Sequence, residues 1–404
     1  MRLFPDSVQP DARLLVCAKG LRAIADGFVS ILLPAYLVAL GYNAKEVGVL
    51  ATATLLGSAA ATLLVGLITA RYGYRRLLLA SSVLMVATGL GFAGLQGFWP
   101  LLVVGFMGTL NPAAGDVSVF VPLEQSLLAR LVADKDRTAL FARYSLAGSL
   151  MGACGTLLAA LPELVAPRLG VTTLGAMQAM FVLYAAIGLA AGAIYARVAS
   201  PHAAATSEKR APLGPSRGIV YRLSALFCVD SFGSGFFAQS ILVLWLLDRF
   251  DLPVAQTAPI FFWSNLLTAV SFLAAVPLSR RIGLINTMVF THIPANLALV
   301  AIPFVDDLAI VIFLLLFRAL LSQMDVPPRA SYVMAVVTAA ERPAAASITN
   351  VPRSLASAVS PAMGGYLLNL TTFGWPLVIG GALKVAYDLG LLVMFRNVKP
   401  PEER

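Results

Sequence analysis

Long apolar segments recur along the whole chain, and this feature limits its fold more than any other. A helix needs about 20 mostly apolar residues to cross a bilayer, and segments of that kind alternate here with short polar loops. Hydrophobic residues make up 59% of the 404 residues and charged residues only 12%, about half the charged fraction of a soluble domain. This composition excludes a soluble globular protein and a disordered chain. The segments lack the alternation of barrel strands, so they predict helices.

The segments predict an all-α membrane protein with twelve transmembrane helices in two six-helix bundles. The expected helices cover residues 13–40, 45–69, 75–96, 98–131, 137–161, 173–197, 218–247, 254–279, 284–304, 307–337, 342–369 and 373–396. Residues 199–217, after the sixth helix, are rich in Pro, Gly and Ser, a composition typical of a linker. We therefore predict an N-terminal bundle at 1–198, a cytoplasmic linker at 199–217 and a C-terminal bundle at 218–404.

The basic residues are sorted by the sides that this topology creates. Nineteen Lys and Arg residues fall on one side, and only Lys45, Arg168 and Arg249 fall on the other. Cytoplasmic loops of membrane proteins carry the excess of Lys and Arg. The chain is therefore predicted to keep both termini and the linker in the cytoplasm. The net charge of +9 follows from this sorting, so it does not indicate a nucleic-acid partner.

The two halves repeat each other. Pro122 and Glu124 in the expected fourth helix are matched 205 positions later by Pro327 and Arg329 in the tenth. The loop after the second helix is similar to the loop after the eighth: Arg71 and Gly73 in the first correspond to Arg281 and Gly283 in the second. Several matches in register predict a duplicated, pseudo-symmetric six-helix unit.

Twelve helices, cytoplasmic termini, a central linker and two related halves resemble the major facilitator superfamily. The family's loop between helices 2 and 3 reads roughly G-x-L-x-D-R-x-G-R-R, and residues 66–76 here read GLITARYGYRR. The acidic position, whose side chain usually latches the cytoplasmic ends together, holds Ala70. Two acid–arginine pairs elsewhere are candidates to replace it. The cytoplasmic gate that the resemblance implies comprises Gly66, Arg71, Gly73, Arg75, Asp136, Arg137, Glu341 and Arg342.

Two glycine motifs point to a branch of that family. The expected fifth helix carries Gly148, Gly152 and Gly155, and the eleventh carries Ser360-Pro361 followed by Gly364-Gly365. Both are similar to the glycine-rich helix 5 motif of proton-driven drug antiporters, although the fifth helix lacks its proline. The resemblance favours efflux over uptake.

Charged side chains inside the apolar segments mark the expected translocation path. Each costs about 2.5–3.5 kcal/mol on insertion scales, and the sequence places thirteen there. Nine of them fall on helices 1, 4, 7 and 10, which line the central cavity in the resembled fold. The carboxylates predicted to carry protons or contact substrate are Asp26, Asp116, Glu124, Asp230 and Asp325. The predicted substrate-binding residues are Arg22, Arg318, Arg329, Arg353 and Tyr332.

Some of these charges have a purely structural interpretation. Residues four apart share a helix face, so Lys384 and Asp388 are expected to neutralise each other. Arg22 with Asp26 and Asp325 with Arg329 have the same spacing. Arg143 is expected level with Glu124, so that a structural salt bridge and a substrate role both stay open for it. Arg318 and Arg353 have no carboxylate at such spacing, and an anionic substrate group is one candidate partner.

The sequence offers no pattern for a catalytic centre, a metal or a cofactor. Cys17, Cys154 and Cys228 fall in apolar segments without a C-x-x-C spacing, and His202 and His292 are isolated in the sequence. There is no Ser-His or His-Glu constellation and no phosphate-binding GxxxxGK[ST] motif. The prediction is a protein that is not an enzyme, with no cofactor and no metal site.

The function predicted from these features is secondary active transport of a small organic solute by alternating access, as proton-coupled export. An uptake permease for an organic anion, with arginines that clamp a carboxylate, is the first alternative. A membrane sensor on the same fold that transports nothing is the second. The expected partners are the solute, protons and membrane lipid, with no nucleic acid, and the expected state is a monomer. The abundance of Ala and Arg over Lys predicts a multi-pass protein of a bacterial inner membrane.

Overall fold

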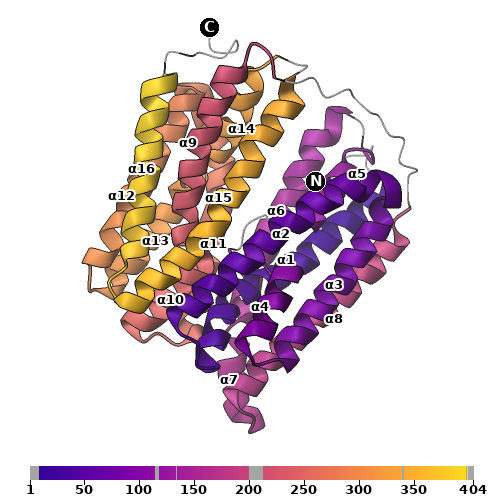
Figure 1. Ribbon diagram of the computed structural model, residues 1–404, viewed down its shortest axis with the longest axis vertical. Helices are drawn as coiled ribbons and strands as arrows, with labels where there is room; N and C mark the ends of the chain where they lie inside the picture. Colours follow the sequence, from indigo (N-terminus) through magenta and orange to yellow (C-terminus); the bar gives the residue numbers. More distant parts are fainter. Residues whose placement is uncertain are drawn as a thin grey trace. The chain divides into compact units, whose positions relative to one another are not determined.

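The computed structural model describes residues 9–113, 118–132, 134–199, 213–338, 341–396 and 398. Side chains are described there except at positions 70, 134, 135, 137–139 and 343. Throughout these residues every regular element is a helix (Figure 1). The all-α membrane fold predicted from the sequence is confirmed.

Ten helical segments in the described chain are long and apolar enough to cross a membrane. The two other expected spans, 98–131 and 342–369, correspond to helices that are too short or too polar for this criterion. The first is divided into α4 (Phe98–Met107) and α5 (Phe120–Leu128), and the second is α15 (Arg342–Leu370). The count of twelve spans stays a prediction.

The chain divides into two compact units. The first is Met1–Ala205 with Asp251–Phe262, and the second is Thr206–Phe250 with Trp263–Arg404. This division lies close to the linker expected at 199–217, but residues 200–212 of that linker lie outside the described residues. The predicted domain boundaries therefore stay a prediction.

In the first unit, α1 is the central helix and packs against α6 and α8, while α3 packs on α8 and α2 on α4. The helices of this unit not yet introduced are α1 (Pro10–Ala39), α2 (Ala44–Tyr72), α3 (Tyr74–Gly94), α6 (Asp134–Leu158), α7 (Leu161–Leu169) and α8 (Thr173–Arg197). The short segment Asp251–Phe262 belongs here because Glu163 of α7 accepts hydrogen bonds from the backbone of Val254 and Ala255 (2.9 and 2.7 Å). A carboxylate at a helix start satisfies free N–H groups and the positive end of the dipole.

In the second unit, α9 packs against α15 and α16, and α16 packs against α12. Its further helices are α9 (Arg217–Phe236), α10 (Gln239–Phe250), α11 (Val254–Ile282, whose first turns lie in the first unit), α12 (Leu284–Ala301), η1 (Ile302–Phe304), α13 (Leu308–Leu321), α14 (Val326–Ala335) and α16 (Trp375–Phe395).

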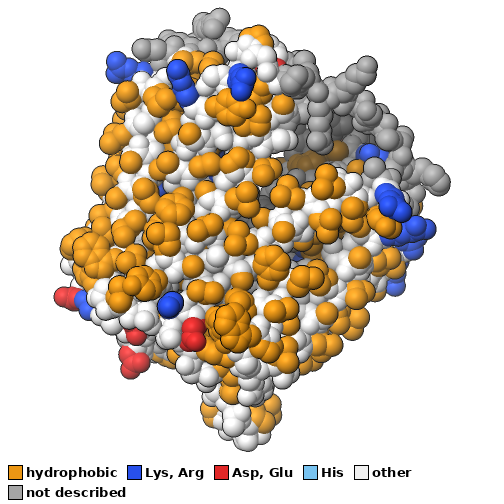
Figure 2. Space-filling view, in the orientation of Figure 1, with side chains coloured by type: hydrophobic (Ala, Val, Ile, Leu, Met, Phe, Trp, Pro, Cys, Tyr) orange, Lys and Arg blue, Asp and Glu red, His pale blue; other side chains and the backbone are white. Residues whose placement is uncertain are grey.

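The outer surface of both units is apolar, as lipid contact requires. Large hydrophobic side chains such as Leu67, Val83 and Val393 are 81%, 69% and 77% exposed. Figure 2 shows apolar side chains spread over the visible face of each unit, with most Lys and Arg side chains near the ends. A soluble protein would not expose this much contiguous apolar surface.

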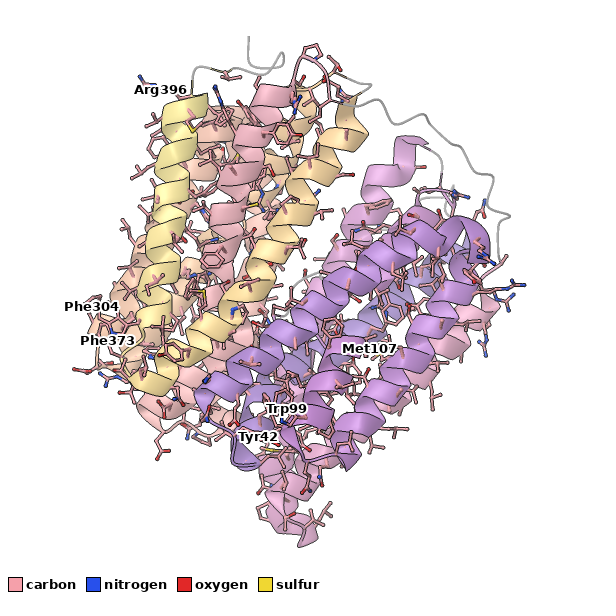
Figure 3. All side chains as sticks on the ribbon, in the orientation of Figure 1. Tyr42, Trp99, Met107, Phe304, Phe373 and Arg396 are labelled. Carbon is pink, nitrogen blue, oxygen red and sulfur yellow. The ribbon has the colours of Figure 1, made fainter. Side chains whose placement is uncertain are left out.

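The second unit has chemically distinct ends. Arg396 lies at one end, and Phe304 and Phe373 lie at the other (Figure 3). An apolar cluster that includes Val220 and Phe395 brings the start of α9 to the Arg396 end. Basic residues gather there, as the sorting of Lys and Arg in the sequence predicts. Which side of the membrane this end faces stays a prediction.

The internal repeat predicted from the sequence has a backbone counterpart. Gly73 joins α2 to α3 with φ of +75°, and Gly283 joins α11 to α12 with φ of +87°. Each backbone N–H caps the helix before it, Gly73 on Thr69 and Gly283 on Ser279. Residues with a Cβ rarely adopt this conformation, which explains glycine at both places.

The expected continuous fourth and tenth helices are wrong, because both are interrupted. The fourth breaks between Met107 and Phe120, where Pro112 disfavours helical geometry. The tenth breaks between Leu321 and Val326, just before Pro327 and Pro328, which lack the N–H groups that would continue α13.

Two further expected boundaries differ in the structure. The seventh span pauses between α9 and α10 at Phe237, whose backbone leaves helical geometry. The fifth ends at Leu158, and a separate helix, α7, begins at Leu161. Pro162 occupies the first turn of α7, a position where proline favours a new helix start.

Candidate functional site

The first unit buries one carboxylate among three hydrogen-bond donors. We call this group the Glu124 cluster: Arg22 on α1, Phe120 and Glu124 on α5, Tyr144 on α6 and Tyr195 on α8. Each of these side chains is buried, with Glu124 fully so. A charge at such a place must be compensated within the protein, because desolvation is costly.

Glu124 receives that compensation through both oxygens. Arg22 donates to Oε2 at 2.5 Å and Tyr144 donates to the same oxygen at 2.6 Å. Tyr195 donates to Oε1 at 2.5 Å and accepts from Arg22 Nε at 2.9 Å. The guanidinium also lies 4.0 Å from the centre of the Phe120 ring. Within this network the charges of Arg22 and Glu124 cancel.

Glycines on α6 let α1 come close enough to build this cluster. A Cβ at Gly155 would collide with the backbone carbonyl of Ile24, and one at Gly27 would collide with the carbonyl of Gly152. The glycine motif of the fifth span is therefore a surface for close backbone packing against α1. Its similarity to an antiporter motif has this local physical basis.

The second unit buries a larger charged group. We call it the Asp230 cluster: Asp230 and Ser234 on α9, Asp325 and Arg329 at the start of α14, and Lys384 on α16. Lys384 Nζ lies 2.6 Å from Asp230 Oδ1 and donates to Ser234 at 2.8 Å. Arg329 Nη1 lies 3.1 Å from Asp230 Oδ2 and 3.2 Å from Asp325 Oδ2. Two acids face two bases, so this cluster also carries no net charge.

A third polar group lies beside it, between α12 and α16. His292 Nδ1 is 2.8 Å from Asp388 Oδ1, and Asn296 donates to Asp388 Oδ2 at 3.0 Å. All three side chains are buried, with exposed fractions of 1%, 0% and 0% in the order His292, Asp388, Asn296. We call His292 and Asp388 the His292 pair.

The second unit repeats the close packing of the first. A Cβ at Gly235 would collide with the carbonyl of Ser357 and the hydroxyl of Ser360. A Cβ at Gly364 would press on the carbonyl of Phe236. The glycine motifs of the fifth and eleventh spans thus serve the same contact, each against the first helix of its own half.

Each of the two units has buried charges on its first and fourth spans. The sequence of the chain agrees with one family. The profile of the Major Facilitator Superfamily matches residues 15–323. The chain belongs to this superfamily. Members of the major facilitator superfamily are transporters, so membership makes this chain a transporter and not an enzyme.

Comparison with individual proteins agrees with that membership. The chain is 23% identical to an uncharacterized membrane protein of Saccharomyces cerevisiae, YJR124C, over 96% of this chain and 94% of the yeast protein. Its fold is similar to the crystal structure of a mutant of the nucleoside transporter NupG, with a TM-score of 0.75, 13% identity and coverage of 95% and 100% of the two chains. It is also similar to the human organic anion transporter MFSD10, with a TM-score of 0.65, 17% identity and coverage of 95% and 100%.

The structure brings together five of the site residues predicted for this superfamily member in two clusters. Arg22 joins Glu124, and Asp230 joins Asp325 and Arg329. Asp26 is half-buried on α1, and Asp116 lies outside the described residues. Whether any of these groups contacts substrate stays a prediction.

The remaining predicted substrate residues have different surroundings. Arg318 stacks on Phe237, 4.6 Å from the ring centre, and its Nε is buried without a hydrogen-bond partner. Arg353 is half-buried on α15. The Tyr332 hydroxyl donates to the backbone carbonyl of Val398 at 3.0 Å, and its role in substrate binding stays a prediction.

The predicted gate residues make contacts inside their own units. Arg75 donates to the carbonyl of Ala196, and Arg342 donates to the carbonyl of Met334. Arg71 lies over the Tyr72 ring. Gly66 lies within α2, Asp136 is half-buried, and the side chain of Arg137 is outside the description.

Glu341 holds the C-terminal end of the predicted linker. It accepts from the backbone N–H of Gly214 at 2.6 Å, from the Ser216 hydroxyl at 2.8 Å and from the Thr338 hydroxyl at 2.7 Å. Hydrogen bonds from Thr338 and Ser216 lower the pKa of Glu341 to about 2. Its role in a gate between the halves stays a prediction.

Of the pairings expected from sequence spacing, one is wrong and one is confirmed. Lys384 binds Asp230 and Ser234 rather than Asp388, because Asp388 is taken by His292 and Asn296. Asp325 lies 3.2 Å from Arg329, as their spacing predicts. Arg22 donates hydrogen bonds to Glu124 and Tyr195, and the two roles left open for Arg143 stay predictions.

The His292 pair and the tyrosines of the Glu124 cluster were missed as polar-network residues. His292 is isolated in the sequence, and tyrosines in apolar segments are mostly packing residues. Partners on different helices leave no spacing signal. Across the described residues, no three His, Cys, Asp or Glu side chains are grouped to hold a metal ion.

Proposed function

We propose that this transporter moves a small organic solute by alternating access, as a proton-coupled exporter. One observation carries the proposal: each unit ties its first span to its fourth through a buried, charge-compensated network, Arg22–Glu124 in one and Asp230–Arg329 in the other. Such charges are costly in an apolar bundle, and a purely structural core would be served by apolar residues.

The fourth span of each half is also interrupted next to its network. The charged residues Glu124 and Arg329 follow the breaks that end at Phe120 and Val326. Transporter sites are often built where helices are discontinuous, because the chain can bend there and free backbone groups can bind solute. This placement supports a transport role over a static one.

The similar structures support a polar organic solute. One is named a nucleoside transporter and the other an organic anion transporter. Both names describe small organic molecules with several hydrogen-bonding groups. We propose the same broad class for this chain, bound with contributions from Asp26, Asp116, Asp325, Arg353 and the two clusters.

The proposal includes the topology expected from the sequence. The six-helix bundles are 1–198 and 218–404, the termini and the linker face the cytoplasm, and the gate comprises the residues named above. The protein is a monomer in lipid, in a bacterial inner membrane. Cysteine accessibility at introduced sites in residues 199–217, measured in whole cells with an impermeant reagent, tests the orientation.

Transport in proteoliposomes tests the function. The purified chain is reconstituted with an internal pH-sensitive dye, and a panel of nucleosides, organic acids, amino acids and drugs is added against an imposed proton gradient. A solute that moves protons in the opposite direction supports proton-coupled export. Solute movement without proton movement overturns the coupling, and no movement of any solute favours a sensor.

A second candidate function is uptake of an organic anion. The surroundings of Arg318 favour it. Its guanidinium is partly buried against Phe237, and among the described residues no carboxylate pairs with it. An anionic group of the solute would supply that charge. Arg318→Gln should then abolish anion binding while Arg318→Lys retains part of it, and equal binding by the two variants contradicts this candidate.

A further inference from the structure

The His292 pair lies outside every residue group assigned to transport above. It joins α12 to α16, whereas both charged clusters include the first and fourth spans of their halves. An imidazole 2.8 Å from a carboxylate can hold one proton between two basic atoms. Burial keeps water from competing for that proton.

The surrounding polar atoms suit two protonation states. Asn296 donates to Asp388 through Nδ2, and its own carbonyl Oδ1 is buried without a partner. Rotation of the amide by a half-turn would present that carbonyl to a protonated Asp388, so the same side chain can serve the carboxylate and the carboxylic acid. The Tyr387 hydroxyl, on the residue before Asp388, is likewise buried without a partner.

Two charged groups on neighbouring helices act on the pair. Lys384 lies one helical turn before Asp388 on α16, and Asp230 lies on α9, where Lys384 binds it. The elements packed against α12 and α16 also carry Arg318 on α13, Asp325 and Arg329 at α14, and Arg353 on α15, and no contact of these four with the pair is part of the argument.

The Asp230 cluster is balanced by itself, so Asp388 is an additional negative charge. With one proton on the His292 pair, the pair is neutral. Without that proton it carries one negative charge in a buried place, which requires a compensating cation. Lys384 is the nearest candidate along the helix, because residues four apart share a face.

We propose that the His292 pair is a proton-binding site and that its occupancy decides which acid holds Lys384. With the proton bound, Lys384 pairs with Asp230, as the structure shows. When the proton leaves to water, the ammonium group moves to Asp388, and Asp230 keeps only Arg329. The proposal rests on the proposed proton coupling and names where the proton binds. It connects the proton to the Asp230 cluster through a single side chain.

Histidine NMR tests the proton site directly. The chain has two histidines, and His202→Gln leaves His292 alone. Purified protein with labelled imidazoles, in lipid nanodiscs, is titrated between about pH 5 and 9, the range in which histidine environments commonly titrate. We expect a protonation step at His292 whose midpoint moves by about one pH unit or more in Asp388→Asn. A resonance without a step, or one that Asp388→Asn leaves unmoved, overturns the proposal.

Melting temperatures test the movement of Lys384. Asp230→Asn should lower Tm more on the acidic side of the His292 step than on the basic side, because Lys384 needs Asp230 only while the proton is bound. Asp325→Asn is the matched control, since Asp325 pairs with Arg329 and not with Lys384. Its effect should be the same on both sides. If the Tm losses of Asp230→Asn and Asp325→Asn depend on pH in the same way, the proposed movement of Lys384 is wrong.

These measurements need no transported solute, so their failure is separate from failure of the transport proposal. In proteoliposomes, suppose that the wild type moves protons with solute and that His292→Gln does the same with unchanged pH dependence. That result overturns this inference alone. A wild type that moves solute without protons overturns the coupling on which it rests.

Discussion

Each unit places an ion pair between its first and fourth spans, and the signs of the charges are exchanged between the two units. In the first, the base is Arg22 on the first span and the acid is Glu124 on the fourth. In the second, the acid is Asp230 on the first span and the base is Arg329 on the fourth. Glu124 and Arg329 are 205 positions apart, the offset of the internal repeat. A duplicated scaffold has kept the contact while reversing its polarity.

The two ion pairs are similar, but the further residues that bind the acid of each pair differ. Glu124 is completed by the phenols of Tyr144 and Tyr195, which stay neutral at ordinary pH. Asp230 is completed by Lys384, with the His292 pair one helical turn further along α16. The first unit therefore holds its charge in a fixed arrangement, and the second holds groups that can exchange protons and partners.

The largest expected effect is removal of the base from the first unit. Arg22→Met leaves Glu124 fully buried without a cation, and such a loss costs about 3–5 kcal/mol. Asp325→Asn in the second unit should cost less, because Arg329 and Lys384 both keep Asp230. Unfolding in mixed micelles of increasing SDS content measures both losses.

A rescue variant sharpens this first prediction. Arg22→Met combined with Glu124→Gln should recover much of the stability, since no unpaired charge remains. If Arg22→Met alone and the single variant of the second unit lose equal stability, the predicted difference between a charge with one partner and a charge with two partners is wrong.

The phenols provide the next effect in size. Tyr195→Phe removes the bond to Glu124 Oε1 and the acceptor of Arg22 Nε. Bonds to charged groups contribute about 1.5–3 kcal/mol. Ser234→Ala in the second unit should cost less, because Lys384 keeps Asp230 at 2.6 Å. The same SDS titration compares them, and a larger loss for Ser234→Ala would contradict the fixed arrangement of the first unit.

The sequence predicted the scaffold well and the contacts poorly, for one physical reason. Hydropathy and turn-forming residues are local signals, so the helical character of the spans and the glycine turns at Gly73 and Gly283 follow from short windows of residues. Ion pairs between helices depend on rotation and depth. Lys384 therefore looked like a partner of Asp388 at the same helix face, while its actual partner, Asp230, is 154 positions away.

Breaks in spans stand between these two cases. Pro327 and Pro328 lie directly after the break of the tenth span, and Pro112 lies in the gap of the fourth. The sequence did not show that each break would immediately precede a residue of a charged cluster. The pairing of Asp325 with Arg329, expected from their spacing, is present at 3.2 Å, whereas Lys384 binds Asp230 and not Asp388.

Close packing by glycine should affect the two halves alike. Gly155→Ala places a methyl group on the Ile24 carbonyl, and Gly364→Ala places one on the Phe236 carbonyl. Overpacking typically costs about 1–3 kcal/mol. Gly94→Ala and Gly218→Ala are matched controls, because a Cβ there meets nothing within 4 Å. Loss of stability in only one of the two packed variants would break the structural equivalence of the glycine motifs.

The smallest effect concerns the acids that hold the two ends of the linker. Asp11 accepts from the backbone of Ala199 at 2.8 Å in the first unit, and Glu341 accepts from Gly214 and Ser216 in the second. Hydrogen bonds from Thr338 and Ser216 lower the pKa of Glu341 to about 2 from an ordinary value near 4.5. Because the folded-state pKa is the lower one, the stabilisation is complete above about pH 4.5 and is lost as pH falls toward 2.

Glu341→Gln should therefore melt below the wild type at neutral pH, with a gap in Tm that closes as the pH falls through that window. A Glu341→Gln deficit that is the same at pH 7 and near pH 2 would mean that the side chain's shape, and not its charge, holds residues 214–216.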